Sequence, residues 1–249
     1  MRLSIALITY NEAARLPACL ASVDFADEVV VVDNGSTDGT VALAQSLGAR
    51  VVQTPDWPGF GVQKNRAVDL CRGDWVFSID ADEQVTPELK AQILSVIAGP
   101  SSDCVAYTVN RSSSYCGRYM RHSGWYPDRV LRLFRRGQAR FSEAAVHESL
   151  QAQGPVGRLE ADLLHQSFAD FETVLDKVNR YSTASAAALA ERGKRGSVPK
   201  AVAHGLWAFF RTYVLKRGFL DGQLGLALAV SNAEGTYYRY MKLWLKQRA

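Results

Sequence analysis

Closely spaced pairs of cysteine or histidine are absent from this chain of 249 residues. Its four cysteines are separated by 52, 33 and 12 positions, so no C-x-x-C pair occurs, and its four histidines form no H-x-x-x-H pair. Zinc sites and dithiol redox centres generally depend on such close pairs. We therefore expect the cysteines to be small buried side chains of a protein that folds without a disulfide or zinc.

Long apolar segments are also lacking. In the C-terminal part, the longest uncharged runs, 201–210 and 222–233, have 10 and 12 residues, whereas a membrane-spanning helix needs roughly 18. Residues 1–8 are not followed by the apolar core and small-residue cleavage site of a signal peptide. Both absences favour a cytoplasmic protein. The 47% of hydrophobic residues excludes wholesale disorder.

Charge is distributed unevenly along the chain. Residues 1–100 hold 7 Lys and Arg against 13 Asp and Glu, residues 101–191 hold 11 against 10, and residues 192–249 hold 11 against 2. An acidic first part suits a site that recruits metal ions. A basic last part suits an anionic surface, which is either phospholipid or nucleic acid.

The first hundred residues alternate short apolar runs with helix-like stretches, which is typical of βαβ units and a parallel sheet. Residues 105–141 are strand-like and rich in arginine, and the pattern becomes helical after residue 168. We therefore expect an α/β domain over residues 1–165 and a basic helical extension over 166–249. The expected strands are 3–9, 28–33, 50–54 and 75–80, and the expected helices are one from 16, then 38–47, 62–71, one from 87, 171–191 and 198–216.

Three of the four expected strands end in polar residues. These are Thr9, Tyr10 and Glu12 after the first strand, Asp33 at the end of the second, and Asp80, Asp82 and Glu83 after the fourth. The carboxyl ends of parallel strands form the ligand-binding edge of an open sheet. Clustered carboxylates there suit Mg²⁺ or Mn²⁺, and Asp33 could bind a base or ribose. The alternatives are a solvated loop after the fourth strand and a helix-capping turn after the second.

The motifs Thr9-Tyr10-Asn11-Glu12, 33–40, Lys64-Asn65 and Asp80-Ala81-Asp82 occur in the order seen in family 2 glycosyltransferases, which the chain resembles over about its first 100 residues. Further on, the chain is similar to the subset of that family that adds glucose to the inner core of bacterial lipopolysaccharide. The residues that carry this second similarity are Tyr126-Pro127-Asp128-Arg129, Arg132-Leu133-Phe134 and Val146-His147-Glu148.

The resemblance implies a GT-A fold, which is a Rossmann-like, mostly parallel sheet flanked by helices, and a metal-dependent, inverting transfer of glucose from UDP-glucose to a core heptose. It implies that Asp82 contacts Mg²⁺ or Mn²⁺ and that Asp80 lies near the ribose or a metal-bound water. His165 either completes the metal shell or is structural. The nucleotide-binding residues implied by the resemblance are Thr9, Tyr10, Glu12, Asp33 for the uracil, and Lys64 for the ribose or phosphates.

An acceptor hydroxyl must lose its proton as it attacks, so the reaction needs a further carboxylate. By the resemblance this general base is Glu148. The alternative is a surface glutamate beside a packed histidine.

The basic extension carries an apolar helical face. On a helix over 198–216, Lys200, His204 and Arg211 lie away from that face. The face either packs against the catalytic domain or lies in the interface of an anionic membrane, on the cytoplasmic side of the inner membrane. Its residues are Val198, Val202, Leu206, Phe209, Phe210 and Tyr213.

Two rival functions remain. One keeps the chemistry but transfers the sugar to a polyprenyl phosphate or another glycan. The other is a nucleic-acid-binding protein that uses the basic extension. We expect no nucleic-acid partner, because the aromatic residues fall on a helical stripe and the acidic strand ends repel phosphate. The expected partners are a nucleotide-sugar donor, a lipid-linked glycan acceptor and an anionic membrane surface.

Overall fold

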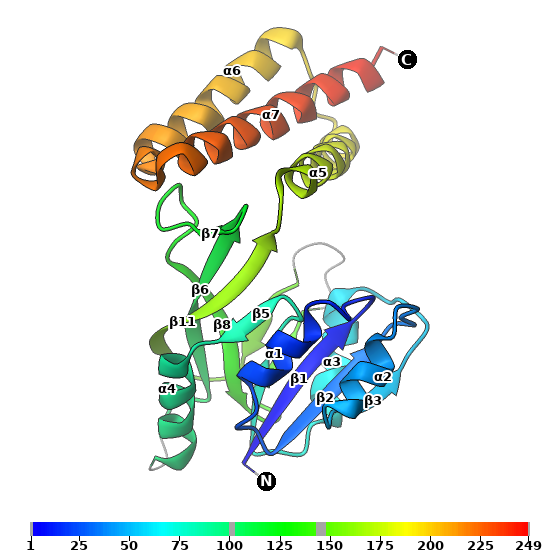
Figure 1. The fold of residues 1–249 in the computed structure, drawn as a ribbon. Helices are drawn as coiled ribbons and strands as arrows, with labels where there is room; N and C mark the ends of the chain where they lie inside the picture. The colour runs from blue at the N-terminus through cyan, green and yellow to red at the C-terminus, as the bar shows by residue number, and fades with distance from the viewer. Residues whose placement is uncertain (1, 100–102, 143–147, 249) are drawn as a thin grey trace. The chain divides into compact units, whose positions relative to one another are not determined.

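The computed structural model describes residues 2–99, 103–142 and 148–248. The chain divides into two compact units (Figure 1). The first consists of Met1–Arg111 and Asp128–His165, and the second of Ser112–Pro127 and Gln166–Ala249. The segment 112–127 therefore belongs with the C-terminal helices although it lies far from them in the sequence.

Four parallel strands form one side of the sheet in the first unit. They are β1 (Leu3–Thr9), β2 (Glu28–Asp33), β3 (Arg50–Gln53) and β4 (Trp75–Ser78), in the order β3-β2-β1-β4. The chain moves outward from β1 to β3 and then crosses to β4 on the other side of β1. This reversal creates a switch point, where ligands bind at the carboxyl ends of the strands. The four expected strands are confirmed, but β4 ends two residues early, so Asp80 lies in the following loop.

Helices cover both faces of these strands because successive side chains alternate between the faces. Ile5 and Leu7 point into a core shared with α1 (Leu16–Ser22), α2 (Thr40–Ser46) and α4 (Pro87–Ala98). Ala6 and Val32 point to the other face, which packs on α3 (Phe60–Leu70). The helix expected from residue 87 begins there, and the side chain of Thr86 caps it, because Thr86 Oγ1 accepts a hydrogen bond from Leu89 N at 3.2 Å.

The sheet continues beyond β4 with further strands, of which β8 runs antiparallel to β4 and β6, and β5 runs antiparallel to β11. Over the described residues, β8, β6, β11 and β5 follow β4 in that order, and β7 pairs with β6. The strand pattern after residue 105 is confirmed, whereas β5 and β11 carry no clear signal in the sequence. These strands are β5 (Glu83–Val85), β6 (Ala106–Tyr115), β7 (Arg118–Tyr119), β8 (Asp128–Arg135) and β11 (Val156–Phe168), with β9 (Ala139–Phe141) and β10 (Leu150–Ala152) forming a separate pair.

Helices dominate the second unit. They are α5 (Phe171–Glu191), α6 (Val198–Phe210), the short π-helix η1 (Arg211–Leu215), the 3₁₀ turn η2 (Gly218–Asp221) and α7 (Gly222–Lys246). Both α5 and α6 pack along α7 (Figure 1). The α6 side chains buried in this packing are small, namely Ala201, Gly205 and Ala208. Among the described residues, no helix is long and apolar enough to cross a membrane.

Asp221, at the start of α7, ties the segment 112–127 to the helices. Its buried carboxylate accepts hydrogen bonds from the backbone N–H groups of Arg121 and His122, at 3.1 and 3.0 Å, and from Ser123 Oγ at 3.0 Å. A buried carboxylate must be paired in this way to offset its lost hydration. The second unit is therefore assembled from segments about a hundred residues apart.

Candidate functional site

The turn that follows β2 is held by the carboxylate of Asp33. Its Oδ1 accepts hydrogen bonds from the backbone N–H groups of Gly35 and Ser36, both at 2.9 Å. Its Oδ2 accepts from Thr9 Oγ1 at 2.8 Å and from Ser36 Oγ at 2.5 Å. Asp33 is fully buried, so a nucleotide base would have to replace one of these four hydrogen bonds to contact this carboxylate.

The loop that follows β1 is joined to the same turn. Asn11 adopts a left-handed conformation, with φ of 55°, which asparagine tolerates better than most residues. Its N–H donates to Ser36 Oγ at 2.8 Å, and its Oδ1 accepts from Thr37 N at 2.8 Å. Glu12 N donates to Thr40 Oγ1 at 2.9 Å. These cross-links make the first two sequence motifs one ordered edge of the sheet.

Tyr10 and Glu12 lie on this edge. The Tyr10 side chain is exposed. The Glu12 carboxylate lies 3.2 Å from Arg15. Burial raises the pKa of Glu12, the charge of Arg15 opposes this, and the negative charges of Asp82 and Asp38 raise the pKa further. The loops after β1 and β4 are thus within electrostatic reach of each other, as a shared binding edge requires.

Lys64 joins two carboxylates that come from separate segments. Its Nζ lies 2.9 Å from Asp80 Oδ1 and 3.4 Å from Glu148 Oε1. The lysine extends from α3 and is largely buried, with its ammonium 5.4 Å from the centre of the Phe141 ring. The structure therefore brings together three of the residues selected from the sequence. Residues 146 and 147, which precede Glu148 in its motif, lie outside the described residues.

Arg132 binds Asp80 from the opposite side. In the antiparallel pair of β8 and β4, Leu133 lies opposite Phe77, which places Arg132 beside the end of β4. Its NH2 donates to Asp80 Oδ2 at 2.8 Å and to Glu83 Oε1 at 2.5 Å. Asp80 is consequently held between two cations, and Glu83 is fully buried behind it.

Burial and charge act differently on the two acids. Burial alone would raise the pKa of Asp80, but the charges of Lys64 and Arg132 outweigh it and hold that pKa well below its ordinary value. Burial raises the pKa of Glu83, against the opposing charge of Arg132 and with a contribution from the Asp80 charge. Burial alone would lower the pKa of Arg132, but the charges of Glu83 and Asp80 outweigh this effect and raise that pKa above its ordinary value. Asp80 is therefore held as an anion.

Asp82 and His165 form a second pair beside this cluster. The antiparallel pairing of β5 and β11 places His165 opposite Glu83, next to Asp82. The distance from His165 Nε2 to Asp82 Oδ2 is 3.4 Å. Two donor atoms on adjacent corners of an octahedral ion with bonds of about 2.1 Å lie about 3 Å apart, so the pair fits one Mg²⁺ or Mn²⁺. Within the described residues, no group of three or more His, Cys, Asp or Glu could hold a metal unaided, so substrate or water would complete the shell.

Sequence reasoning placed Glu83 in the acidic cluster but gave Arg132 no role in this site. Arg132 stands in a series of arginines, and the partner strand of β8 cannot be read from local pattern. The sequence does contain one indication that Arg132 is paired with an acid, because Arg132 lies between Leu131 and Leu133 in a strand-like segment. A charge in a strand of that kind is almost never buried unless an opposite charge pairs with it.

Comparison with known proteins gives consistent results. Residues 4–151 match the family described as glycosyl transferase family 2. A glycosyltransferase of Rickettsia typhi is 32% identical over 253 residues, covering 97% of this chain and 86% of that protein. The lipopolysaccharide core biosynthesis glycosyltransferase LpsC of Rhizobium meliloti is 33% identical over 257 residues, covering 96% of this chain and 93% of that protein.

A solved structure agrees in fold. The S. aureus protein TarS, residues 1–349 in complex with UDP-GlcNAc, superposes on 100% of this chain and 92% of its own with a TM-score of 0.52 and 15% identity. At that identity the likeness concerns the fold alone. The predicted GT-A α/β fold with a helical C-terminal extension is confirmed.

The chain belongs to glycosyl transferase family 2. It is a nucleotide-sugar-dependent glycosyltransferase, as the sequence motifs predict.

Proposed function

We propose that this enzyme transfers glucose from UDP-glucose to a heptose of a lipid-linked lipopolysaccharide core, with inversion at the anomeric carbon. The observation that carries the proposal is the convergence of Lys64, Asp80 and Glu148 at the carboxyl edge of the sheet. The 33% identity to LpsC along almost the whole chain supports a lipopolysaccharide acceptor. The choice of UDP-glucose rests on the resemblance of the motifs.

The nucleotide lies along the edge formed by the loops after β1 and β2. Tyr10 and Glu12 contact it directly, and Thr9 and Asp33 act by ordering the turn. The ammonium of Lys64 lies between the carboxylates of Asp80 and Glu148, at the edge of the sheet where the nucleotide binds. From there Lys64 balances the negative charge of the phosphates. Asp80 stays ionised and keeps Lys64 and Arg132 in place.

Asp82 and His165 would hold Mg²⁺ or Mn²⁺. When bound, the ion would supply Lewis acidity and charge stabilisation for the departing pyrophosphate. The donor set supports this assignment, because a carboxylate oxygen and an imidazole nitrogen 3.4 Å apart can both reach one such ion.

Glu148 acts as the general base. Its Oε1 faces Lys64, so we assign to Oε2 the proton that leaves the acceptor hydroxyl. Attack on the side of the sugar opposite the pyrophosphate inverts the anomeric centre, so an α-linked donor gives a β-linked product.

A lipid-linked acceptor requires the enzyme to reach a membrane surface, and α6 supports this. The small residues of α6 pack on α7. Its large apolar residues are exposed, and they recur every four residues from α6 into η1. Leu206 is 67% exposed and Trp207 is 54% exposed. We call this surface the α6 stripe; it consists of Val198, Val202, Leu206, Trp207, Phe210, Val214 and Leu215.

Exposed cations flank the α6 stripe. Lys200, Arg211, Lys216 and Arg217 are all exposed, and residues 192–249 carry a net charge of +9. Apolar side chains that enter the acyl boundary, together with cations at the headgroups, are typical of helices that lie in an anionic interface. We therefore place the α6 stripe on the anionic surface of the membrane that carries the acceptor.

A donor and acceptor matrix tests the proposal. Purified enzyme with Mn²⁺ is incubated with labelled UDP-glucose, UDP-galactose and UDP-GlcNAc, each against heptose-terminated core lipid, polyprenyl phosphate and short RNA. We expect a β-glucosyl heptose product, identified by the anomeric coupling constant in NMR. Transfer to polyprenyl phosphate alone would favour the rival acceptor, and RNA binding without any transfer would refute the proposal.

A further inference from the structure

A cavity of about 260 Å³ lies between α5 and α7 in the second unit. Several of the side chains that line it are small and leave the space unfilled, including Ser182, Ser185 and Gly235. A Cβ added to Gly235 would lie 3.6 Å from Val178 Cγ1, so the backbones approach closely but without a clash. The volume is near the lower end for ligand pockets and suits a small polar molecule better than a nucleotide sugar.

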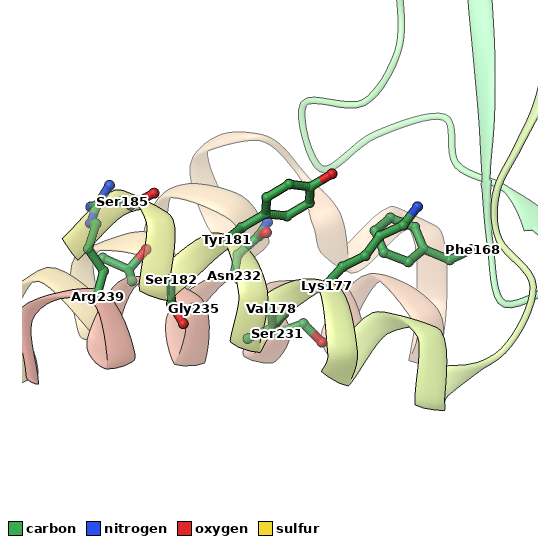
Figure 2. A pocket seen from close by; sticks show the side chains of 11 residues that line it. Phe168, Lys177, Val178, Tyr181, Ser182, Ser185, Ser231, Asn232, Gly235 and Arg239 are labelled. Carbon is green, nitrogen blue, oxygen red and sulfur yellow. The ribbon is translucent and has the colours of Figure 1, made fainter. Parts of the chain in front are cut away.

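Among the residues that the structure describes, two cations and no acidic side chain line this cavity. Lys177 donates to Ser167 O at 2.9 Å and lies over the ring of Phe168, 4.4 Å from its centre. In the view of Figure 2, Lys177 with Phe168 occupies one end and Arg239 with Ser185 the other. The wall is therefore positively charged along its length, which favours an anion.

Arg239 carries the most specific signal. Its Nε is buried and, over the described residues, has no hydrogen-bond partner. The guanidinium also lies 5.0 Å from the centre of the Tyr240 ring. A buried N–H without an acceptor is costly, and an oxygen of a bound anion would satisfy it.

The hydroxyl groups of the wall narrow the class of anion. Ser231 and Ser182 are engaged within the protein, since Ser231 Oγ lies 2.9 Å from Tyr115 OH and Ser182 Oγ accepts from Lys242 Nζ at 2.8 Å. Ser185, Thr236 and Tyr181 add further hydroxyls between the two cations. We propose that this cavity binds a phosphate ester that itself carries hydroxyl groups, of the size of a phosphorylated sugar or a phosphoglycerol. This site is separate from sugar transfer and does not depend on the proposed function.

Calorimetric titration of the full chain tests the site. The probes are glucose 6-phosphate, glycerol 3-phosphate, inorganic phosphate and glucose, with dihexanoyl phosphatidylglycerol below its micelle concentration as the lipid source. The variant is Arg239→Gln, and the matched control is Arg248→Gln, which lies just beyond the end of α7 with its guanidinium 4.9 Å from the centre of the Trp244 ring. Thermal unfolding of both variants verifies the fold.

We expect saturable 1:1 binding of the phosphate esters, weakened about tenfold or more by Arg239→Gln and unchanged by Arg248→Gln, because a charge-assisted hydrogen bond is lost. If the short-chain lipid binds more tightly than glycerol 3-phosphate, the natural ligand is a lipid headgroup. If the two bind equally, the natural ligand is a soluble metabolite. Glucose binding as tightly as its phosphate, an equal effect of both variants, or no saturable binding of any probe would overturn the site.

Discussion

The two units of this protein depart from ordinary surface and core chemistry in opposite ways. In the first unit, Arg132 and Glu83 are charged groups in the interior. In the second unit, Leu206 and Trp207 are large apolar groups in contact with solvent. Neither arrangement is what folding alone favours, because buried charges are costly and exposed apolar surface gains nothing. The comparison teaches that each unit contains groups whose placement costs folding free energy, and that these groups mark the two surfaces to which we propose functions.

The largest expected effect tests the metal pair of the first unit. Asp82→Asn removes a charged ligand from a partly exposed loop, so the fold stays intact while turnover falls by several orders of magnitude. Turnover and Mn²⁺ binding in the presence of UDP are measured side by side, with Asp24→Asn, which alters an exposed carboxylate paired with Lys90, as the control. Unchanged turnover, or transfer by the parent enzyme in excess chelator, would contradict the assignment.

The next effect tests the acceptor side of the same site. Glu148→Gln keeps the shape of the side chain but cannot accept a proton, so we expect turnover to fall by about 10²–10⁴-fold with UDP and Mn²⁺ affinity changed by no more than a few fold. Glu160→Gln, which alters an exposed carboxylate paired with Arg129, is the control. A parallel collapse of nucleotide affinity would move Glu148 to the donor side.

A third prediction concerns the buried charges themselves. Arg132→Met leaves Asp80 and Glu83 without their shared cation, and we expect the free energy of unfolding at pH 7 to fall by about 3–5 kcal/mol. Arg129→Met, on the same strand but exposed, should change it by less than about 1 kcal/mol. Urea unfolding measures both differences.

The pH dependence sharpens this third prediction. The lowered pKa of Asp80 stabilises the parent fold above the ordinary carboxyl value of 3.8, and this contribution is lost as the pH falls below it. Without Arg132, both acids take up protons more readily. At low pH the protonated acids no longer repel each other, so the variant loses less of its free energy of unfolding than it does at pH 7. The gap between parent and Arg132→Met is therefore full at pH 7 and narrows below about pH 4. A gap that stays constant would show that Arg132 acts by packing and not by charge.

The smallest expected effect tests the second unit. Replacing Leu206, Trp207 and Phe210 together by serine should lower partition to anionic vesicles by about tenfold or more, because each loses on the order of 1 kcal/mol of burial in the interface. Replacing the exposed Leu47, Leu94 and Leu175 by serine is the matched control. Sedimentation with anionic and neutral vesicles measures partition.

A charge variant completes the membrane test. Replacing Lys200, Arg211, Lys216 and Arg217 by Gln should remove the preference for anionic over neutral vesicles and its salt sensitivity. Transfer to a soluble acceptor should persist in both sets of variants. Absence of vesicle binding by the parent protein would refute the role given to the α6 stripe.

Much of the fold follows from local pattern, because the strands that end at Thr9 and Asp33 are short apolar runs and a glycine-containing turn follows Asp33. The part of the sheet beyond β4 does not, since β5 has only three residues and its partner β11 is far away in the sequence. The candidate site shows the same division. Asp80 and Asp82 are recognisable from motif, whereas Arg132 required the register of β8 on β4.

The α6 helix shows why a helical stripe alone does not predict burial. The stripe of large residues was recognisable from spacing, and two uses of it were open. Packing on α7 instead selects Ala201, Gly205 and Ala208, which lie on another face. Close helix contact at Gly205, whose added Cβ would meet Ala233 O at 3.3 Å, excludes large side chains there. The contact partner, and not the periodicity, decides which face is covered.

The Asp221 junction also orders events during synthesis. The groups it binds in residues 121–123 emerge from the ribosome about a hundred residues before Asp221 itself. At about 5–20 residues per second, that segment waits on the order of 5 to 20 seconds for its carboxylate. Tyr115 and Met120 wait equally long for Leu228, with which they form a buried cluster. A chain shortened before α7 would lack Leu228 and leave this cluster incomplete, so residues 112–127 and the terminal helices should be kept or removed together.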